Sequence, residues 1–174
     1  MRRVDEIGND EHVRGPQDAA LTVIEYGDFQ CPYSARAHFA LRELDGQFGG
    51  IRLVYRHLPL AHLHPLAGLA AEAAEAANGQ DRFWDMHDAL FKHQRRVTGE
   101  QDLAALAESL DLDIERFHAE VRERHHRPRV QADAERAHHD GATGTPTFTI
   151  NGVRYRGDSD RASLESALSE ALGR

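Results

Sequence analysis

Short apolar runs separated by polar segments mark the strands at the start of the chain. Residues 21–27 and 51–57 are apolar enough to predict two buried strands. Residues 33–44 lie between them, contain no Gly or Pro, and place apolar side chains at helical spacing. Residues 1–20 are polar and are expected to lead into the first strand through a turn. A strand, a helix and a strand in this order predict a parallel βαβ unit with a right-handed crossover.

The middle of the chain changes to the period of amphipathic helices. Pro65 is suited to begin an alanine-rich helix that ends near Ala77, and further helices are expected over residues 83–91, 102–110, 114–124 and 128–139. Helices with this pattern bury their apolar faces against one another. We therefore expect a helical block that covers one side of the sheet.

Strand character returns only near the end of the chain. Residues 147–150 predict a strand, and the Asn-Gly pair at 151–152 is a strong hairpin signal before a partner strand at 153–156. Asp158 or Ser159 is expected to cap a last helix. The element order is a strand, a helix and a strand, then a helical block, then two strands and a helix, which predicts an α/β fold.

Composition narrows the classes of function. The net charge of −8 argues against nonspecific binding to nucleic acid, and no apolar stretch approaches the length of a membrane span. The first residues lack the apolar core of a secretory signal, so a cytoplasmic protein is expected, or a periplasmic one if a leader has been removed. The chain has one cysteine and therefore no internal disulfide.

The single cysteine, Cys31, follows the first strand and directly precedes the first predicted helix. Pro32 comes next, and proline is favoured at the first helical position. Cys31 is therefore expected to be the N-cap residue, where free N–H groups and the helix dipole favour a thiolate. Such positions lower a thiol pKa from about 8.5 to roughly 3.5–7.5. The alternative is a small buried apolar side chain, which is common for a lone cysteine.

Two motifs together carry a family resemblance. The sequence Asp-Phe-Gln-Cys-Pro-Tyr-Ser at residues 28–34 and the sequence Gly-Thr-Pro-Thr-Phe-Thr-Ile-Asn-Gly at residues 144–152 resemble the DsbA-like branch of the thioredoxin superfamily. The chain is also similar to the thioredoxin-like domain fused to some bacterial sodium/proton antiporters. The resemblance implies a thioredoxin-fold domain formed by residues 1–62 and 140–174, with residues 63–139 as a large inserted helical domain. In this fold Cys31 is the nucleophile.

The resemblance also implies a substrate site at the second motif. The dipeptide alone favours a trans Thr145–Pro146 bond, because only about 5–6% of such bonds are cis in folded proteins. The family instead implies a cis Pro146 lying against the Cys31 loop, with the backbone of Thr145 pairing with an extended substrate. Pro32 and Tyr33 would then tune the surroundings of the thiolate.

Ser34 departs from the family pattern Cys-x-x-Cys, because the second cysteine is replaced. In a dithiol enzyme that second cysteine resolves the mixed disulfide. Ser34 lacks a sulfur and is expected only to donate a hydrogen bond that stabilises the Cys31 thiolate. We therefore expect Cys31 to form mixed disulfides with protein thiols or low-molecular-weight thiols, with glutathione as a co-substrate rather than a bound cofactor.

Ser34 leaves several explanations open. The chain is a natural monothiol enzyme, or it carries a substitution introduced to trap a mixed disulfide. It is alternatively a redox-inactive relative that keeps the groove for binding. A glutathione-dependent transferase or isomerase of the kappa-class type shares the helical insertion, but these enzymes usually carry serine where Cys31 stands.

Histidines and acids near the predicted site complete the candidates. The densest of the 12 histidines are His62 with His64, and the adjacent pairs at 125–126 and 138–139. Adjacent side chains on a helix diverge by roughly 100°, so we expect solvated histidines and no metal site. Glu25 and Asp28 are candidates for proton transfer near Cys31, with solvated carboxylates as the alternative reading.

Overall fold

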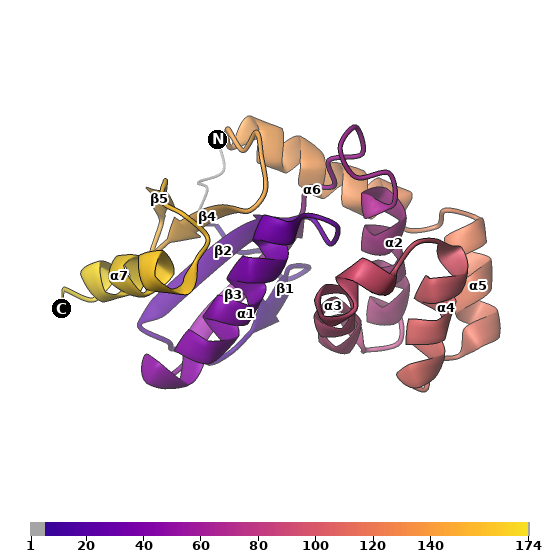
Figure 1. The fold of residues 1–174 in the computed structure, drawn as a ribbon, viewed down its shortest axis with the longest axis horizontal. Coiled ribbons are helices and arrows are strands. Elements are labelled where there is room, and N and C mark those ends of the chain that lie inside the picture. Colours follow the sequence, from indigo (N-terminus) through magenta and orange to yellow (C-terminus); the bar gives the residue numbers. More distant parts are fainter. Residues whose placement is uncertain (1–5, 174) are drawn as a thin grey trace.

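A five-stranded sheet forms the centre of the protein in the computed structural model, which describes residues 6–173 (Figure 1). The strands follow the spatial order β1-β3-β2-β4-β5. Their bounds are β1 His12–Arg14, β2 Leu21–Gly27, β3 Ile51–His57, β4 Thr147–Ile150 and β5 Val153–Tyr155. β2 and β3 pair in parallel, and the remaining pairs are antiparallel. The predicted βαβ unit and the C-terminal hairpin are both confirmed.

The predicted helices are all present, with ends within three residues of the expected positions. They are α1 Pro32–Gln47, α2 Ala67–Asn78, α3 Phe83–Lys92, α4 Glu100–Ser109, α5 Ile114–Arg122, α6 Arg127–His139 and α7 Arg161–Ala171, with a short 3₁₀ helix η1 at Gln94–Arg96. The predicted cap of α7 is wrong. Asp160 directly precedes this helix, and its carboxylate accepts a hydrogen bond from the backbone of Ser163 at 3.1 Å.

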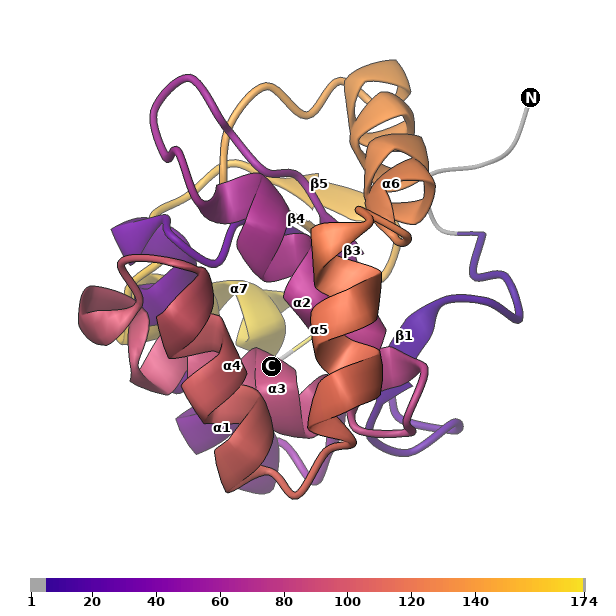
Figure 2. The ribbon, with the colours of Figure 1, turned by 90° about the vertical axis from the view of Figure 1, so that its right-hand side faces the viewer.

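The two faces of the sheet are covered by different helices. α1 and α7 pack on the face that carries Val23 and Leu53. α6 lies on the opposite face, where Ala137 packs near Tyr26. α2 to α5 lie beside the sheet rather than on it (Figures 1 and 2). The expectation that the whole helical block covers one side therefore holds only for α6.

α2 lies at the centre of the helical insertion and contacts α3, α4, α5 and α6. Its alanine side chains are almost completely buried: Ala67, Ala70, Ala71, Ala73, Ala74, Ala76 and Ala77. Alanine has the highest helix propensity and adds little volume, so several helices can approach the α2 backbone closely.

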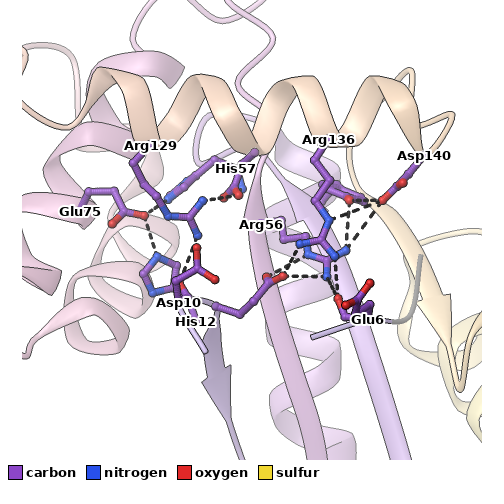
Figure 3. Close-up of polar contacts among 12 residues, drawn as sticks. Glu6, Asp10, His12, Arg56, His57, Glu75, Arg129, Arg136 and Asp140 are labelled. Atoms are coloured by element: carbon purple, nitrogen blue, oxygen red, sulfur yellow. Dashed lines mark hydrogen bonds and ion pairs between the residues drawn. The ribbon is translucent and has the colours of Figure 1, made fainter. Parts of the chain in front are cut away.

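β1 is a strand that the polar N-terminal sequence did not predict. It has three residues and pairs with the outer edge of β3. A buried ionic network holds the segment before it against β3 and α6 (Figure 3). Arg56 of β3 is fully buried and donates to both carboxylate oxygens of Glu11 at 2.9 Å, and Arg136 of α6 pairs with the same carboxylate. The segment before β1 is therefore held against β3 and α6 by charge pairs between distant residues, which an apolar pattern in the sequence does not reveal.

The structure bears on two further expectations. Across residues 6–173, every helix is too short or too polar to cross a membrane. The helices α2 to α6 all lie within the range 63–139 that was expected to form an inserted domain. The division into one domain of residues 1–62 and 140–174 and another of residues 63–139 stays a prediction.

Candidate active site around Cys31

Cys31 lies at the start of α1, as its position before Pro32 predicted. It is the N-cap residue, with extended backbone angles of φ −74° and ψ 120°. Its Sγ donates a hydrogen bond to the carbonyl oxygen of Thr145 at 3.2 Å, across 114 positions of sequence. The Thr145–Pro146 peptide bond is cis. The fold therefore brings together the two motifs that carried the family resemblance.

The sulfur is covered, although its neighbours in sequence are not. Only 3% of the Cys31 surface is exposed, whereas Tyr33 is 57% exposed and Pro32 also faces solvent. A carbonyl oxygen accepts a hydrogen bond only from the protonated thiol. The contact with Thr145 thus belongs to the neutral form, and the side chain must leave it before the sulfur can react as an anion.

Ser34 contacts the loop that precedes α1. Its side chain is fully buried, and its Oγ accepts a hydrogen bond from the backbone N–H of Asp28 at 3.3 Å. The contact found for this hydroxyl is therefore with the loop before α1, and the hydrogen bond expected from Ser34 to the Cys31 thiolate stays a prediction. In this position Ser34 holds the end of β2 against the first turn of α1.

Asp28 is neither solvated nor directed to the sulfur. Its Oδ1 accepts from the backbone of Gln30 at 2.8 Å, and its Oδ2 accepts from the backbone of Leu60 at 2.9 Å. The Nδ1 of His64 contacts the same Oδ2 at 2.8 Å. The alternative reading as a solvated carboxylate is wrong, because this buried group links the loop after β2 with the loop after β3.

Glu25 is also buried rather than solvated, and its role in proton transfer stays a prediction. It lies on β2 beside Tyr55 of β3, is 1% exposed, and its Oε1 has no hydrogen-bond partner. Burial raises the pKa of Glu25 to about 8, because the charged carboxylate loses its hydration. The Tyr55 hydroxyl is also buried without a partner, and burial likewise raises the pKa of Tyr55.

Gln94 is a site residue that sequence reasoning missed. Its side-chain amide Nε2 donates to the carbonyl oxygens of Phe29 at 2.8 Å and of Cys31 at 3.0 Å. Gln94 belongs to η1 in the helical insertion, so the insertion directly supports the loop that carries the sulfur. A glutamine in a polar stretch offers no sequence signal for such a contact.

The structure brings buried histidines together in two groups that were not predicted. One joins His12, His57 and Glu75, and the other joins His38, His87 and Asp88, with donor atoms within 4.8 Å of one another in each group. Figure 3 shows Glu75 contacting both histidines of the first group. Neutral imidazole with carboxylate is a donor set that binds divalent metal ions, so either group could hold one.

Individual histidines are also less solvated than expected. His64 contacts Asp28, and His126 contacts Glu120 at 2.6 Å, whereas His62, His125, His138 and His139 are exposed as predicted. Burial lowers the pKa of His38 to about 4 and that of His87 to about 3. These two side chains are therefore neutral at neutral pH.

Sequence comparisons identify the family to which this chain belongs. A family model described as thioredoxin matches residues 8–170. The Na(+)/H(+) antiporter NhaA 1 of Salinispora arenicola is 47% identical over 162 residues, which are 93% of this chain and 25% of the relative. The NhaA 1 of Mycolicibacterium gilvum is 44% identical over 94% of this chain and 27% of its own length. The chain spans about a quarter of these curated relatives.

Solved structures show the same fold. A thioredoxin-like oxidoreductase from Silicibacter pomeroyi has a TM-score of 0.79 and 26% identity, covering 96% of this chain and 95% of its own. BdbD from Bacillus subtilis has a TM-score of 0.80 and 22% identity, covering 94% of both chains. The α-DsbA1 of Wolbachia pipientis has a TM-score of 0.79 and 18% identity, covering 96% of this chain and 93% of that chain. The chain therefore belongs to the thioredoxin family, and its fold is the DsbA-like form with helices inserted between the two halves.

Proposed function

We propose that this chain carries out thiol–disulfide exchange through Cys31, as a single-cysteine oxidoreductase of the DsbA-like type. The observation that carries the proposal is the position of the sulfur at the N-terminus of α1, 3.2 Å from the Thr145 carbonyl oxygen. Free N–H groups at a helix N-terminus stabilise a thiolate. The backbone of Thr145 offers an edge along which a peptide or small thiol can lie.

The proposed reaction has two exchange steps. Cys31 loses its proton, and its Sγ attacks one sulfur of a disulfide R–S–S–R′. A Cys31–S–S–R bond forms, the original S–S bond breaks, and R′–S⁻ leaves and takes up a proton. Because Ser34 has no sulfur, an external thiol such as glutathione must attack the mixed disulfide and restore the Cys31 thiol. Over the cycle the chain gains and loses no electrons.

The buried carboxyl of Glu25 on β2 supports a simple assignment of the proton. Glu25 has an unpartnered carboxylate oxygen in the interior, and its raised pKa of about 8 suits a group that exchanges protons near neutral pH. We assign proton handling to Glu25 and binding of the substrate to the Thr145–Pro146 turn with Pro32 and Tyr33. The cycle needs a supply of reduced thiol, and we place it in the cytoplasm for that reason.

The pH dependence of alkylation tests the activated sulfur. Iodoacetamide labelling of Cys31, followed by intact mass, should show a rate midpoint well below the free-thiol value of about 8.5. The same chain unfolded in urea provides the reference for this thiol, and Cys31→Ser provides the unlabelled baseline. A folded midpoint equal to or above the unfolded one would contradict the proposal.

A second candidate function is favoured by the burial of Cys31, which is 3% exposed and bonded through its thiol hydrogen. Under this candidate the chain is a redox-inactive thioredoxin-fold protein that uses the groove for binding. Incubation with oxidised glutathione separates the two. Exchange predicts a glutathionyl adduct that dithiothreitol reverses, whereas binding alone predicts a folded chain that stays unmodified.

A cysteine at position 34 would restore the Cys-x-x-Cys pattern and test whether the rest of the site still supports redox chemistry. Ser34→Cys is nearly isosteric and places a second thiol one helical turn after Cys31. Insulin reduction by this variant should exceed that of the parent. Activity equal to the parent would favour the binding role, provided that circular dichroism shows the fold unchanged.

A further inference from the structure

An open, polar cavity begins at the Thr145–Pro146 turn and extends toward β5. Its lining includes Tyr33 and Arg36 of α1, Pro146 of the turn, and Arg154 and Arg156 at the end of the chain's last hairpin. Thr145 also lines this cavity, and its carbonyl oxygen holds the Cys31 sulfur. A molecule in the cavity therefore lies next to the group proposed to react.

Two of the cavity arginines are held in place by neutral groups. Arg36 donates from Nε and Nη2 to the hydroxyl of Ser159 at 3.3 and 3.1 Å, and its guanidinium carbon lies 5.3 Å from the ring centre of Tyr33. Arg154 donates from Nη2 to the carbonyl oxygen of Gly141 at 3.1 Å. Such contacts restrict the side chains without neutralising their charge.

The cavity therefore carries a local positive charge in a chain whose net charge is −8. Within the described part of the chain, Arg36, Arg154 and Arg156 form no ion pair, and Asp158 is the one carboxylate that lines the cavity. By contrast, Arg14 and Arg56 elsewhere on the sheet are paired with carboxylates. Arginines left unpaired around one hollow are suited to bind an anion.

We propose that this cavity binds the carboxylates of a low-molecular-weight thiol or disulfide and presents its sulfur to Cys31. The inference rests on the proposed function and names its co-substrate class. Guanidinium groups bind carboxylates through paired hydrogen bonds. A small molecule carrying carboxylates a few bonds from its sulfur reaches both the arginines and the Cys31 turn. The covalent step is the exchange already written, in which one S–S bond forms as another breaks.

A series of disulfides that differ in charge tests this recognition. Oxidised glutathione is anionic, 2-hydroxyethyl disulfide is neutral and cystamine is cationic. The rate of adduct formation on Cys31 is measured by intact mass. For each disulfide, this rate is divided by the rate at which the same disulfide reacts with a small neutral thiol, which corrects for its intrinsic reactivity. The normalised rates should fall in the order anionic, neutral, cationic, and added salt should reduce the difference.

Arginine variants identify the residues responsible. Arg36→Gln, Arg154→Gln and Arg156→Gln should each lower the normalised rate with oxidised glutathione by up to about fivefold, the upper end of the range for an exposed charge pair. The rate with 2-hydroxyethyl disulfide, which carries no charge for the arginines to bind, should fall much less. Arg122→Gln on the remote helix α5 removes the same charge at an exposed position and should have no effect.

A non-reactive ligand separates failure of this inference from failure of the proposed function. S-methylglutathione keeps both carboxylates but cannot exchange, and its binding is followed by NMR shifts at residues 33–36 and 154–159. Binding that Arg156→Gln weakens supports the cavity whether or not Cys31 reacts. No binding at millimolar concentration, or adduct rates independent of disulfide charge, would overturn the inference and leave the exchange proposal standing.

Discussion

Replacing Glu25 by glutamine should change how the stability of the protein depends on pH. Glu25 is 1% exposed, faces the interior beside Tyr55, and has an unpartnered Oε1. Burial raises its pKa from 4.5 to about 8. The folded protein therefore keeps this carboxyl protonated in a pH range where the unfolded chain has already lost the proton.

The pKa shift of Glu25 gives both the sign and the size of its effect on the free energy of unfolding. A difference of one pKa unit corresponds to 1.36 kcal/mol, so a shift from 4.5 to about 8 amounts to roughly 5 kcal/mol. This contribution is fully present below pH 4.5 and is lost as pH rises to about 8, because in that range the folded state binds the extra proton. Glutamine has no proton to lose, so the Glu25→Gln variant should gain stability relative to the parent across this range.

Urea unfolding followed by circular dichroism measures the difference. At about pH 5 the two proteins should differ little through this group, and at about pH 9 the variant should be more stable by up to about 5 kcal/mol. Glu108→Gln, at an exposed position of α4, is the matched control and should show no pH-dependent difference. A Glu25→Gln difference that is constant from pH 5 to pH 9 would refute the buried protonated carboxyl.

Three further changes test other parts of the structure. Burial lowers the pKa of His87 to about 3, so the parent should lose stability as pH falls below about 6.5, and His87→Phe should reduce that loss in acid urea titrations. Glu11→Gln removes the carboxylate that pairs with the buried Arg56 at 2.9 Å, while Asp140 stays 3.9 Å from Arg56, and should cost about 3 kcal/mol in urea unfolding; a cost below about 1 kcal/mol would contradict the pairing. Gln94→Ala removes the donor to two carbonyls of the Cys31 loop and should speed amide hydrogen exchange at residues 29–34, whereas unchanged exchange would show that the contact has no stabilising role.

Local sequence patterns were sufficient for the elements that carry the sulfur. The apolar run before Asp28, the proline at position 32 and the helical spacing after it together placed Cys31 at the N-cap of α1. The Asn-Gly pair likewise placed the hairpin between β4 and β5. These features depend on neighbouring residues in the chain, and such features are accessible without a structure.

Contacts between distant elements were not accessible in this way. Asp28 lies at a strand end and looked solvated, yet the loop after β3 buries it through Leu60 and His64. His12 belongs to β1, a strand of three residues. This strand is held in place by its pairing with β3 and by the ion pair between Glu11, just before it, and Arg136 of α6. Gln94 meets the Cys31 loop only because the insertion packs there. Each depends on tertiary packing, which one sequence does not encode as a local pattern.

The alanine-rich helix α2 has a consequence for how this chain can vary. Its alanine side chains are buried and the helix contacts α3, α4, α5 and α6, so a larger side chain at Ala73 or Ala76 would displace a neighbour and cost about 1–3 kcal/mol. At these alanine positions volume therefore limits substitution, whereas Glu72 and Glu75 of the same helix are buried in ion pairs. Sequence drift among relatives should be concentrated on the outward faces of α4 and α5, where added atoms extend into solvent.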